Sequence, residues 1–390
     1  GPLLLLVDTV PGQAREAGAD ALTTVAGSGT PLGAPVARAT EIPSGIVFAH
    51  TGVAVASWLS KFLRERSVER AVLVSGAGSR DVLGRSLAID VGAQVALTGV
   101  EVSSCEWAET ERVAAAIEAA GATAVVGVGG GRSLDVAKYA ASEAGLPFVA
   151  VPTQASHDGM CSPVAVLRGP GDKGTDSYGA RPPMALVVPV FAIAQAPRRT
   201  LVSGMADLSV NGLAIMDWEW ARELHGEPFD DYAALLGRSA AELILARRDL
   251  YEPGRRFTDE DVEILVHGLV LSGLAMTVAG SSRPCSGPEH LISHAFDALG
   301  LGEGLHGEQV ALGARVAVRF LGPAGGRVVE LLDRIGAPRS PDEIGIGRDD
   351  ALRAVRIAGS VRPERRSRLA AALAADPDHV VAEAEAAWYG

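Results

Sequence analysis

The chain has 390 residues, 48% of them hydrophobic and 21% charged, so it is long enough for roughly two or three domains and its composition argues against disorder. Lys and Arg number 35 against 47 Asp and Glu, a formal net charge of −12. Such an acidic chain is a poor general binder of nucleic acid, although a locally positive pocket can still hold a small phosphorylated molecule.

The cysteines and the apolar runs indicate a reducing compartment and no membrane segment. Cys105, Cys161 and Cys285 are odd in number and widely spaced, which fits neither a disulfide framework nor a CxxC metal site. The apolar run 3–7 follows no cationic segment and is too short for a secretory signal. No run reaches the ~18 uninterrupted apolar residues of a spanning helix. We therefore expect a cytoplasmic protein.

In the first half of the chain, short β-branched runs alternate with segments of helical periodicity. Strands are predicted at 71–75, 93–100, 124–128, 148–151 and 185–188, and helices at 113–120 and 134–144. Strands and helices that alternate in this way indicate right-handed crossovers and a parallel sheet.

From about residue 201 onward, long helical patterns take over. Helices are predicted at 218–224, 232–247, 259–279, 288–299, 307–320 and 369–388, the last as one Ala-rich helix with its Glu residues in solvent. A domain boundary is expected near residue 190. The sequence thus predicts a nucleotide-binding α/β domain at 1–190 and a helical domain at 191–390, with a ligand between them.

A glycine-rich turn lies between a predicted strand and a predicted helix. Gly129, Gly130 and Gly131 have no side chains, so the backbone can approach a pyrophosphate, and the helix N-terminus that follows offers free N–H groups. The run is not GxGxxG, and a tight turn explains three glycines as well. Asp135 and Lys138 follow on the helix, either as cofactor contacts or as an ordinary intrahelical pair.

The segment 151–159 follows the next predicted strand. Thr153 and Ser156 carry hydroxyls, and His157 and Asp158 stand together at the carboxyl end of the strand, where open α/β sheets bind ligands. The alternative is a loop capped by Ser156 or Asp158.

Three of the eight histidines are clustered. His290 and His294 are four residues apart, hence on one helical face, and His306 follows closely. A catalytic divalent metal site needs about three protein ligands, for which two histidines and one carboxylate suffice. The carboxylate is left open by the spacing: the candidates are Asp207, Asp158, Glu289, Asp297 and Glu308.

A polar loop at 280–287 precedes the helix that carries His290. Its one arginine, Arg283, is either an ordinary surface residue or a ligand for phosphate, which arginine binds through two parallel hydrogen bonds.

These stretches together resemble the sn-glycerol-1-phosphate dehydrogenase family, within the superfamily of iron-containing alcohol dehydrogenases, glycerol dehydrogenase and dehydroquinate synthase. The resemblance covers most of 45–320, and its strongest pieces are GVGGGRSLDVAK at 127–138, VPTQASHDG at 151–159, SRPCSGPEH at 282–290 and LHGEQ at 305–309. Asp207-Leu208 and Asp217-Trp218 also resemble the sequences of this family.

The resemblance implies a dehydroquinate synthase-like fold, with a Rossmann-like N-terminal domain followed by an all-helical C-terminal domain. It implies Asp207, His290 and His306 as ligands of a divalent metal, usually zinc, with His294 near the substrate but off the metal. NADH or NADPH is the implied cofactor, with its pyrophosphate on the glycine-rich turn. The residues expected near cofactor or substrate are Thr153, Ser156 and Asp158.

The usual substrate of that family is dihydroxyacetone phosphate, and a homo-oligomer is expected. In a metal-dependent oxidoreductase, the metal would stabilise the developing alkoxide, His294 or a water would relay the proton, and Arg283 would hold the phosphate. Residues 1–45 match the family poorly and are expected to form a variant edge of the sheet. Pro189 replaces a common Asp, Asn211 replaces a common Lys, and Glu101 is a candidate for the ribose hydroxyls.

Two other functions compete with the dehydrogenase. A sugar-phosphate cyclase resembling dehydroquinate synthase would carry the same histidines, but typically has Glu at the first ligand and a Lys shortly after it. Asp207 therefore favours the dehydrogenase, while the absence of the Lys fits neither enzyme. A non-catalytic nucleotide-binding scaffold is disfavoured by the complete ligand set.

Overall fold

A six-stranded parallel sheet forms the first half of the protein. The computed structural model describes residues 42–169, 174–247, 256–301, 304–322 and 325–390, so the predictions for 1–41 lie outside the described residues. The sheet has the order β1-β8-β5-β4-β2-β3, with every pair parallel. Its strands are β1 (Gly45–Ala49), β2 (Arg70–Ser75), β3 (Ala96–Glu101), β4 (Ala124–Gly129), β5 (Phe148–Pro152) and β8 (Ala185–Pro189).

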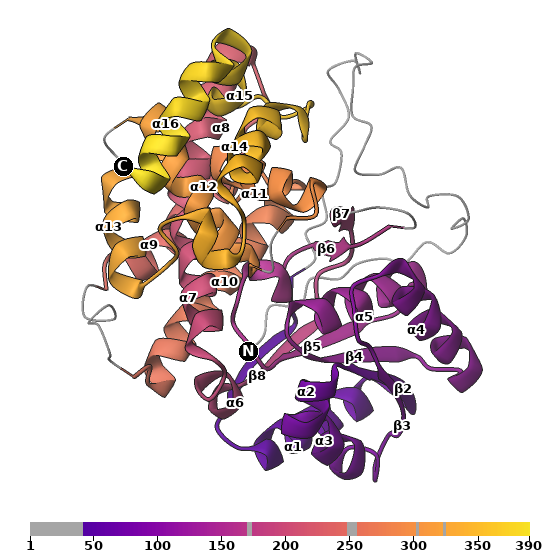
Figure 1. The fold of residues 1–390 in the computed structure, drawn as a ribbon. Coiled ribbons are helices and arrows are strands. Elements are labelled where there is room, and N and C mark those ends of the chain that lie inside the picture. The colour runs from indigo at the N-terminus through magenta and orange to yellow at the C-terminus, as the bar shows by residue number, and fades with distance from the viewer. Residues whose placement is uncertain (1–41, 170–173, 248–255, 302–303, 323–324) are drawn as a thin grey trace. The chain divides into compact units, whose positions relative to one another are not determined.

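Helices cover both faces of this sheet, which is why its central strands are apolar throughout (Figure 1). Successive side chains of a strand point to opposite faces. Accordingly, Ala71 and Leu73 of β2 pack in the core of α1 and α3, whereas Val72 and Val74 pack in the core of α4 and α5. The covering elements are α1 (Gly52–Glu65), α2 (Ala77–Ser79), the π-helical turn η1 (Arg80–Gly84), α3 (Arg85–Asp90), α4 (Trp107–Ala120) and α5 (Gly131–Glu143).

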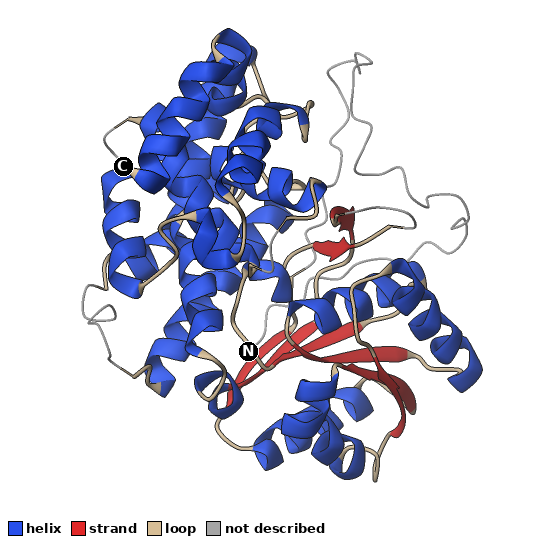
Figure 2. Ribbon diagram, in the orientation of Figure 1, coloured by secondary structure: helices blue, strands red, loops and turns tan. Residues whose placement is uncertain are grey.

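After β5, a short 3₁₀ turn, η2 (Asp158–Met160), leads into an antiparallel hairpin, β6 (Val164–Leu167) and β7 (Asp176–Gly179). The sequence analysis did not predict this hairpin, since each strand is only four residues long. Figure 2 shows the hairpin apart from the large sheet.

The described residues after Pro189 form helices and connecting loops (Figure 2). The α7, α11 and α12 helices, which carry the clustered carboxylate and histidines, contact one another through α12. The helices are α6 (Val190–Ala194), α7 (Arg198–Ser209), α8 (Asn211–His225), α9 (Asp231–Leu245), α10 (Asp259–Ala279), α11 (Pro288–Ala298), α12 (His306–Leu321), α13 (Gly326–Ile335), α14 (Arg348–Ile357), α15 (Arg368–Ala375) and α16 (Pro377–Tyr389), with 3₁₀ turns η5 (Pro341–Ile344) and η6 (Ala358–Ser360).

Among the predicted elements whose bounds differ in the structure, two have a clear physical cause. The strand predicted at 93–100 begins at Ala96, because residues 91–95 form the turn that leaves α3. The single helix predicted at 369–388 is wrong, because it is broken into α15 and α16. Pro377 has no N–H to continue the first helix, and the Asp376 carboxylate starts the second by accepting from the backbone N–H of His379 at 3.0 Å.

Among the described helices, α10 is long and apolar enough to cross a membrane by length and composition. More than half of its apolar window, 56%, is buried inside the protein, and a core helix passes the same test. Its bounds match the prediction, since Thr258 and Asp261 form a capping box at its start and Gly280, at a φ of +65°, ends it.

Gly204 of α7 allows the closest approach between that helix and the loop after β5. A Cβ atom built on Gly204 would lie 2.0 Å from the carbonyl oxygen of Ala155, whereas one on Gly212 of α8 would meet nothing within 4 Å. We expect Gly204→Ala to lower the free energy of unfolding by about 1–3 kcal/mol through overpacking.

The matched control is Gly212→Ala, which we expect to be neutral or to stabilise by up to about 1 kcal/mol, because alanine restricts the unfolded chain. Denaturant unfolding followed by circular dichroism measures both. Equal stability of the two variants would contradict the tight approach at Gly204.

Candidate metal and nucleotide site

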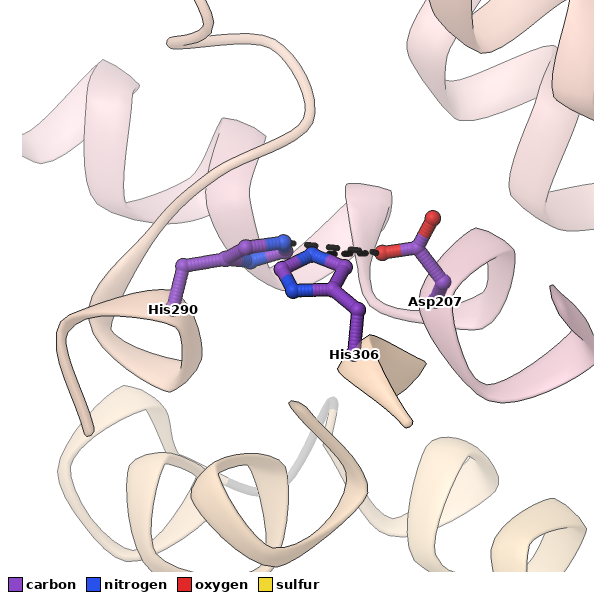
Figure 3. A group of neighbouring side chains, drawn as sticks. All are labelled: Asp207, His290 and His306. Atoms are coloured by element: carbon purple, nitrogen blue, oxygen red, sulfur yellow. Dashed lines mark ion pairs between the residues drawn. The ribbon is translucent and has the colours of Figure 1, made fainter. Parts of the chain in front are cut away.

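Three side chains from separate helices converge on one point. Asp207 comes from α7, His290 from α11 and His306 from the first residue of α12. The Oδ1 atom of Asp207 lies 3.5 Å from Nε2 of His290 and 3.6 Å from Nε2 of His306, and the candidate ligand atoms all lie within 4.8 Å of one another (Figure 3). We call this set, Asp207, His290 and His306, the ligand triad.

Two glycines allow these helices to approach one another closely. A Cβ on Gly307 would lie 1.9 Å from the carbonyl oxygen of Ser203, and the N–H of Gly307 donates to the Ser203 hydroxyl at 3.1 Å. A Cβ on Gly313 would lie 2.1 Å from the carbonyl oxygen of Glu289. Larger residues at either glycine would move the histidines relative to Asp207.

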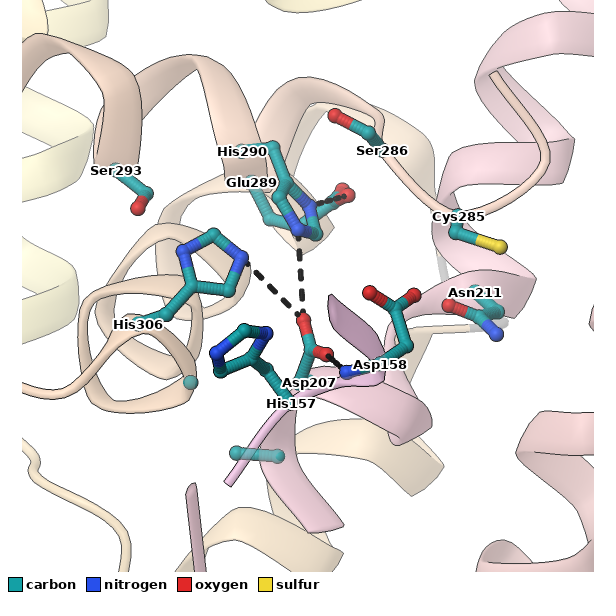
Figure 4. A network of polar contacts seen from close by, with 12 residues as sticks. His157, Asp158, Asp207, Asn211, Cys285, Ser286, Glu289, His290, Ser293 and His306 are labelled. Atoms are coloured by element: carbon teal, nitrogen blue, oxygen red, sulfur yellow. Dashed lines mark hydrogen bonds and ion pairs between the residues drawn. The ribbon is translucent and has the colours of Figure 1, made fainter. Parts of the chain in front are cut away.

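Neighbouring groups fix the orientation of the triad. Glu289 Oε1 lies 2.9 Å from Nδ1 of His290, which directs the Nε2 atom of that ring to Asp207. The backbone N–H of Asp158 donates to Oδ2 of Asp207 at 3.1 Å, so the other oxygen, Oδ1, faces the two imidazoles (Figure 4). Glu289 is fully buried, and its Oε2 atom has no hydrogen-bond partner among the described residues.

The charges of the triad are strongly coupled. Burial opposes the charge of Asp207, but the hydrogen bond and charge of His290, with the charge of His306, lower the pKa of that carboxyl to about 2. Burial also opposes protonation of His290, yet its contacts with Asp207 and Glu289 raise its pKa to about 9. Burial lowers the pKa of His306 to about 3.

The donor set fits a divalent cation. One ionised carboxylate and two imidazole nitrogens facing a common point are a three-ligand set that leaves a coordination position open. Several divalent metals accept such ligands, so the donors by themselves do not select zinc or iron.

The other carboxylates that the sequence left open have other partners. Glu289 and Asp158 support the triad from outside, as described above. Glu308 pairs with Arg199 at 2.8 Å, and Asp297 accepts from the side-chain amide of Gln309 at 3.1 Å. Of these five carboxylates, Asp207 is the one that the structure groups with His290 and His306.

Asp158 lies beside the triad as a second buried carboxyl. Its Oδ2 atom accepts from the Ser272 hydroxyl at 2.6 Å, and Asn211 donates to the same hydroxyl at 3.0 Å. Burial, with the charge of Asp207, raises the pKa of Asp158 to about 6. Asn211, where the resemblance led us to expect lysine, thus belongs to the hydrogen-bond chain that holds Asp158.

His157 joins the glycine-rich turn to the triad. Its ring centroid lies 5.8 Å from that of His306, and its Nδ1 accepts from the N–H of Gly159 at 2.9 Å. A Cβ on Gly131 would lie 2.3 Å from Nε2 of His157. The sequence analysis noted His157 only as a neighbour of Asp158. Its place after β5, at the carboxyl edge of the sheet, was the available signal.

The glycines at the turn lie in close contact with neighbouring side chains. Gly129 has a φ of +150°, and a Cβ on Gly130 would lie 2.6 Å from Oε1 of Gln154. Thr153 donates its backbone N–H to the carbonyl of Gly129 at 2.9 Å, and the carbonyl of Ser156 accepts from the Ser203 hydroxyl at 2.8 Å. The turn and the segment 153–156 therefore lie together and against α7.

Asp135 and Lys138 are buried inside the α/β half. The Nζ atom of Lys138 lies 3.1 Å from Oδ1 of Asp135 and donates to the carbonyls of Gly159 and Ser162 at 2.7 and 3.4 Å. The Lys138 side chain is 0% exposed. Its two hydrogen bonds to backbone carbonyls hold the η2 turn, which contains Asp158, in place. Asp135 and Lys138 thus form the intrahelical pair that was one of the two alternatives, and their contact with the cofactor stays a prediction.

His294 lies next to the triad but outside it. Its ring centroid is 6.3 Å from that of His290. Burial, with the positive charges of Arg362 and other neighbours, holds the pKa of His294 well below its ordinary value. The group of candidate ligand atoms comprises Asp207, His290 and His306, so the role of His294 near the substrate stays a prediction.

Arg283 contacts three protein groups, and its predicted role as a phosphate ligand stays a prediction. Its Nη1 donates to Asp217 at 3.1 Å, its Nε to Glu227 at 2.7 Å, and its Nη2 to the carbonyl of Arg366 at 2.9 Å. At the far edge of the sheet, Glu101 pairs with Arg80, so it too already has a partner.

The chain matches a family model and several proteins of known function. The sequence model of the iron-containing alcohol dehydrogenase family matches residues 50–197. Glycerol-1-phosphate dehydrogenase [NAD(P)+] of Methanoculleus marisnigri is 40% identical over 299 residues, which cover 76% of this chain and 81% of that one. The enzyme of the same name from Pyrococcus furiosus is 37% identical over 294 residues, 75% of this chain and 84% of that one.

Solved structures share the fold at lower identity. A probable glycerol dehydrogenase from Sinorhizobium meliloti 1021 superposes with a TM-score of 0.73 at 22% identity, covering 91% of this chain and 100% of that one. A sulfoacetaldehyde reductase from Bifidobacterium kashiwanohense, in complex with NAD+, gives a TM-score of 0.69 at 17% identity, covering 92% of this chain and 100% of that one. These matches support a Rossmann-like half followed by a helical half.

Asp217 and Arg283 form a buried ion pair whose loss should lower the stability of the fold. Asp217 is 0% exposed and Arg283 7%, and removing the Asp217 charge breaks this buried pair and leaves Arg283 with Glu227 as its one carboxylate partner. We expect Asp217→Asn to lower the free energy of unfolding by about 3 kcal/mol.

The control is Glu330→Gln, which breaks the exposed pair with Arg334 and should cost less than about 0.5 kcal/mol. Chemical denaturation measures both variants. A loss for Asp217→Asn no larger than that of the control would show that the buried pair does not stabilise the fold.

Proposed function

Because the chain belongs to the glycerol-1-phosphate dehydrogenase family of iron-containing alcohol dehydrogenases, we propose that it reduces dihydroxyacetone phosphate, or a closely related phosphorylated ketone, to sn-glycerol 1-phosphate or the corresponding alcohol. The observation that carries the proposal is the convergence of Asp207, His290 and His306 next to the glycine-rich turn, which His157 joins to the triad. An electrophilic centre beside a nucleotide-binding turn is the arrangement that hydride transfer requires.

The nicotinamide cofactor, NAD(H) or NADP(H), supplies or accepts the hydride when bound, which no amino-acid side chain can do. The residues proposed to hold it are those at the carboxyl ends of β4 and β5. The turn Gly129–Gly131 offers backbone N–H groups at the start of α5, where a pyrophosphate is stabilised. Thr153 and Ser156 lie on the segment after β5. Lys138, paired with Asp135, holds the η2 turn that follows this segment.

A divalent metal, which we propose to be zinc, supplies Lewis-acid stabilisation of developing negative charge when bound. Asp207, His290 and His306 would hold it. Glu289 orients His290, and the N–H of Asp158 orients the Asp207 carboxylate. In this division of labour, the part up to residue 190 binds the nucleotide, and the part from 191 binds metal and substrate.

A proton has to reach the oxygen of the reduced carbonyl. His294 is a neutral imidazole one helical turn after His290, so we propose that its ring relays this proton. Asp158 keeps its carboxyl close to the triad through Ser272 and is the second group proposed to act there. We also propose a cytoplasmic homo-oligomer.

The reaction is tested by the absorbance of reduced nicotinamide. We expect the full-length protein, loaded with zinc, to consume NADH or NADPH stoichiometrically with added dihydroxyacetone phosphate, because the ketone is the hydride acceptor. A cyclase would recycle the cofactor and show no net consumption. Sustained turnover of a sugar phosphate with unchanged absorbance would therefore refute the dehydrogenase.

The triad is tested by metal content. Asp207→Asn removes the one ionised ligand, so we expect at least ~10-fold weaker zinc binding, measured by metal analysis after dialysis. Asp297→Asn is the matched control, since that carboxyl bonds to Gln309 outside the triad and its loss should leave zinc content unchanged.

Chelation should abolish turnover while the circular dichroism spectrum is retained, because the α7, α11 and α12 helices pack through apolar residues of the protein. Zinc should restore activity. Full activity of Asp207→Asn without bound metal would overturn the assignment of the triad.

A further inference from the structure

Arg365 has a partly buried guanidinium whose hydrogen-bond partners among the described residues are all uncharged. It lies in the connection between η6 and α15. Its Nη1 donates to the carbonyl oxygen of Ser286 at 2.7 Å and its Nη2 to the Ser282 hydroxyl at 2.8 Å. Within the part of the chain that the structure describes, no carboxylate oxygen pairs with Arg365, and two of its five N–H groups have no acceptor.

The surroundings of Arg365 disfavour its positive charge. Burial, together with the positive charges of Arg283 and Arg362, lowers the pKa of Arg365 to about 10. Glu289 and Glu364 favour the charge from a longer range, but no hydrogen bond or ion pair joins either carboxylate to Arg365, so an anion bound beside the guanidinium would stabilise it further.

Arg283 differs from Arg365 in this respect. Two carboxylates, those of Asp217 and Glu227, balance the charge of Arg283. Arg283 also donates to the carbonyl of Arg366, and Asp217 accepts from the N–H of Arg368 at 2.8 Å. Arg283 therefore positions the segment that carries Arg365, and it is Arg365 that has charge to offer a ligand.

The hydrogen-bond partners of Arg365 lie just before the helix that carries His290. Its partners Ser282 and Ser286 belong to the loop that runs directly into α11, and Ser286 lies only four residues before His290. Figure 4 shows Ser286 near Glu289 and His290. The charges of Arg362 and Arg365 also help to hold His294 neutral, so both arginines lie within electrostatic reach of that ring.

We propose that Arg365, with the hydroxyls of Ser282 and Ser286, binds the phosphate group of the substrate. Each hydroxyl accepts from Arg365 and so keeps its own hydrogen to donate to a phosphate oxygen. The free N–H groups of Arg365 supply further donors, and a phosphate accepts the paired donors of a guanidinium well. This inference rests on the proposed function for the identity of the substrate, and it replaces Arg283 as the phosphate ligand.

The test uses the zinc-loaded full chain and three variants: Arg365→Gln, Arg365→Lys and the control Arg366→Gln, whose side chain is exposed. Inorganic phosphate is titrated calorimetrically, and turnover is measured with dihydroxyacetone phosphate and with dihydroxyacetone. We expect Arg365→Gln to weaken phosphate binding and to raise KM for dihydroxyacetone phosphate by about 10- to 100-fold, the factor for lost charge-assisted hydrogen bonds.

The same variant should leave kcat/KM for dihydroxyacetone within about two-fold, since that ketone lacks the phosphate. Arg365→Lys should recover part of the affinity because it keeps the charge but not the planar fork, and Arg366→Gln should behave as wild type. Should Arg365→Gln fail to fold, Ser282→Ala is measured in its place, with the same selective effect expected at smaller size.

The outcomes separate the two proposals. Arg365-dependent binding of inorganic phosphate without any turnover of dihydroxyacetone phosphate would refute the proposed function and keep the anion site. Turnover of dihydroxyacetone phosphate with an unchanged KM in Arg365→Gln, or equal losses for both ketones, would overturn the phosphate assignment and leave the proposed function standing.

Discussion

The site depends on how the Asp207 carboxylate is shared. One of its oxygens accepts from the backbone N–H of Asp158, and the other faces the imidazoles of His290 and His306. The carboxylate thus connects the loop after β5, in the sheet half, with two helices of the second half. Burial makes an isolated carboxylate unfavourable, so its ionised form is retained only because positive or donating groups surround it.

The surrounding groups keep that geometry without contacting the common point themselves. Glu289 orients His290, Lys138 holds the η2 turn by its carbonyl oxygens, and Ser272 connects Asp158 to Asn211. A second layer of this kind fixes the direction of each donor and its protonation state, which the donors alone do not determine. It also explains why polar residues within an otherwise apolar core are tolerated, since most have partners.

Charge balance separates two arginines that look alike in the sequence. Arg283 is neutralised by two carboxylates and bonds to a backbone carbonyl, which makes it part of the scaffold. Arg365 is partly buried and donates to hydroxyls and a carbonyl, none of which carries a negative charge. The difference lies entirely in which acceptors the fold brings to each guanidinium.

The sequence by itself determined the parallel sheet, the helical second half, the glycine-rich turn and the two histidines of α11 and α12, because periodicity and local motifs are properties of neighbouring residues. It could not choose among five carboxylates, nor detect that Pro377 divides a helix whose two parts are equally Ala-rich. The choice of Asp207, the contact of His157 with the turn and the partners of Arg283 and Arg365 were decided only by tertiary structure. Each joins residues tens of positions apart, and their proximity follows from packing that no local pattern records.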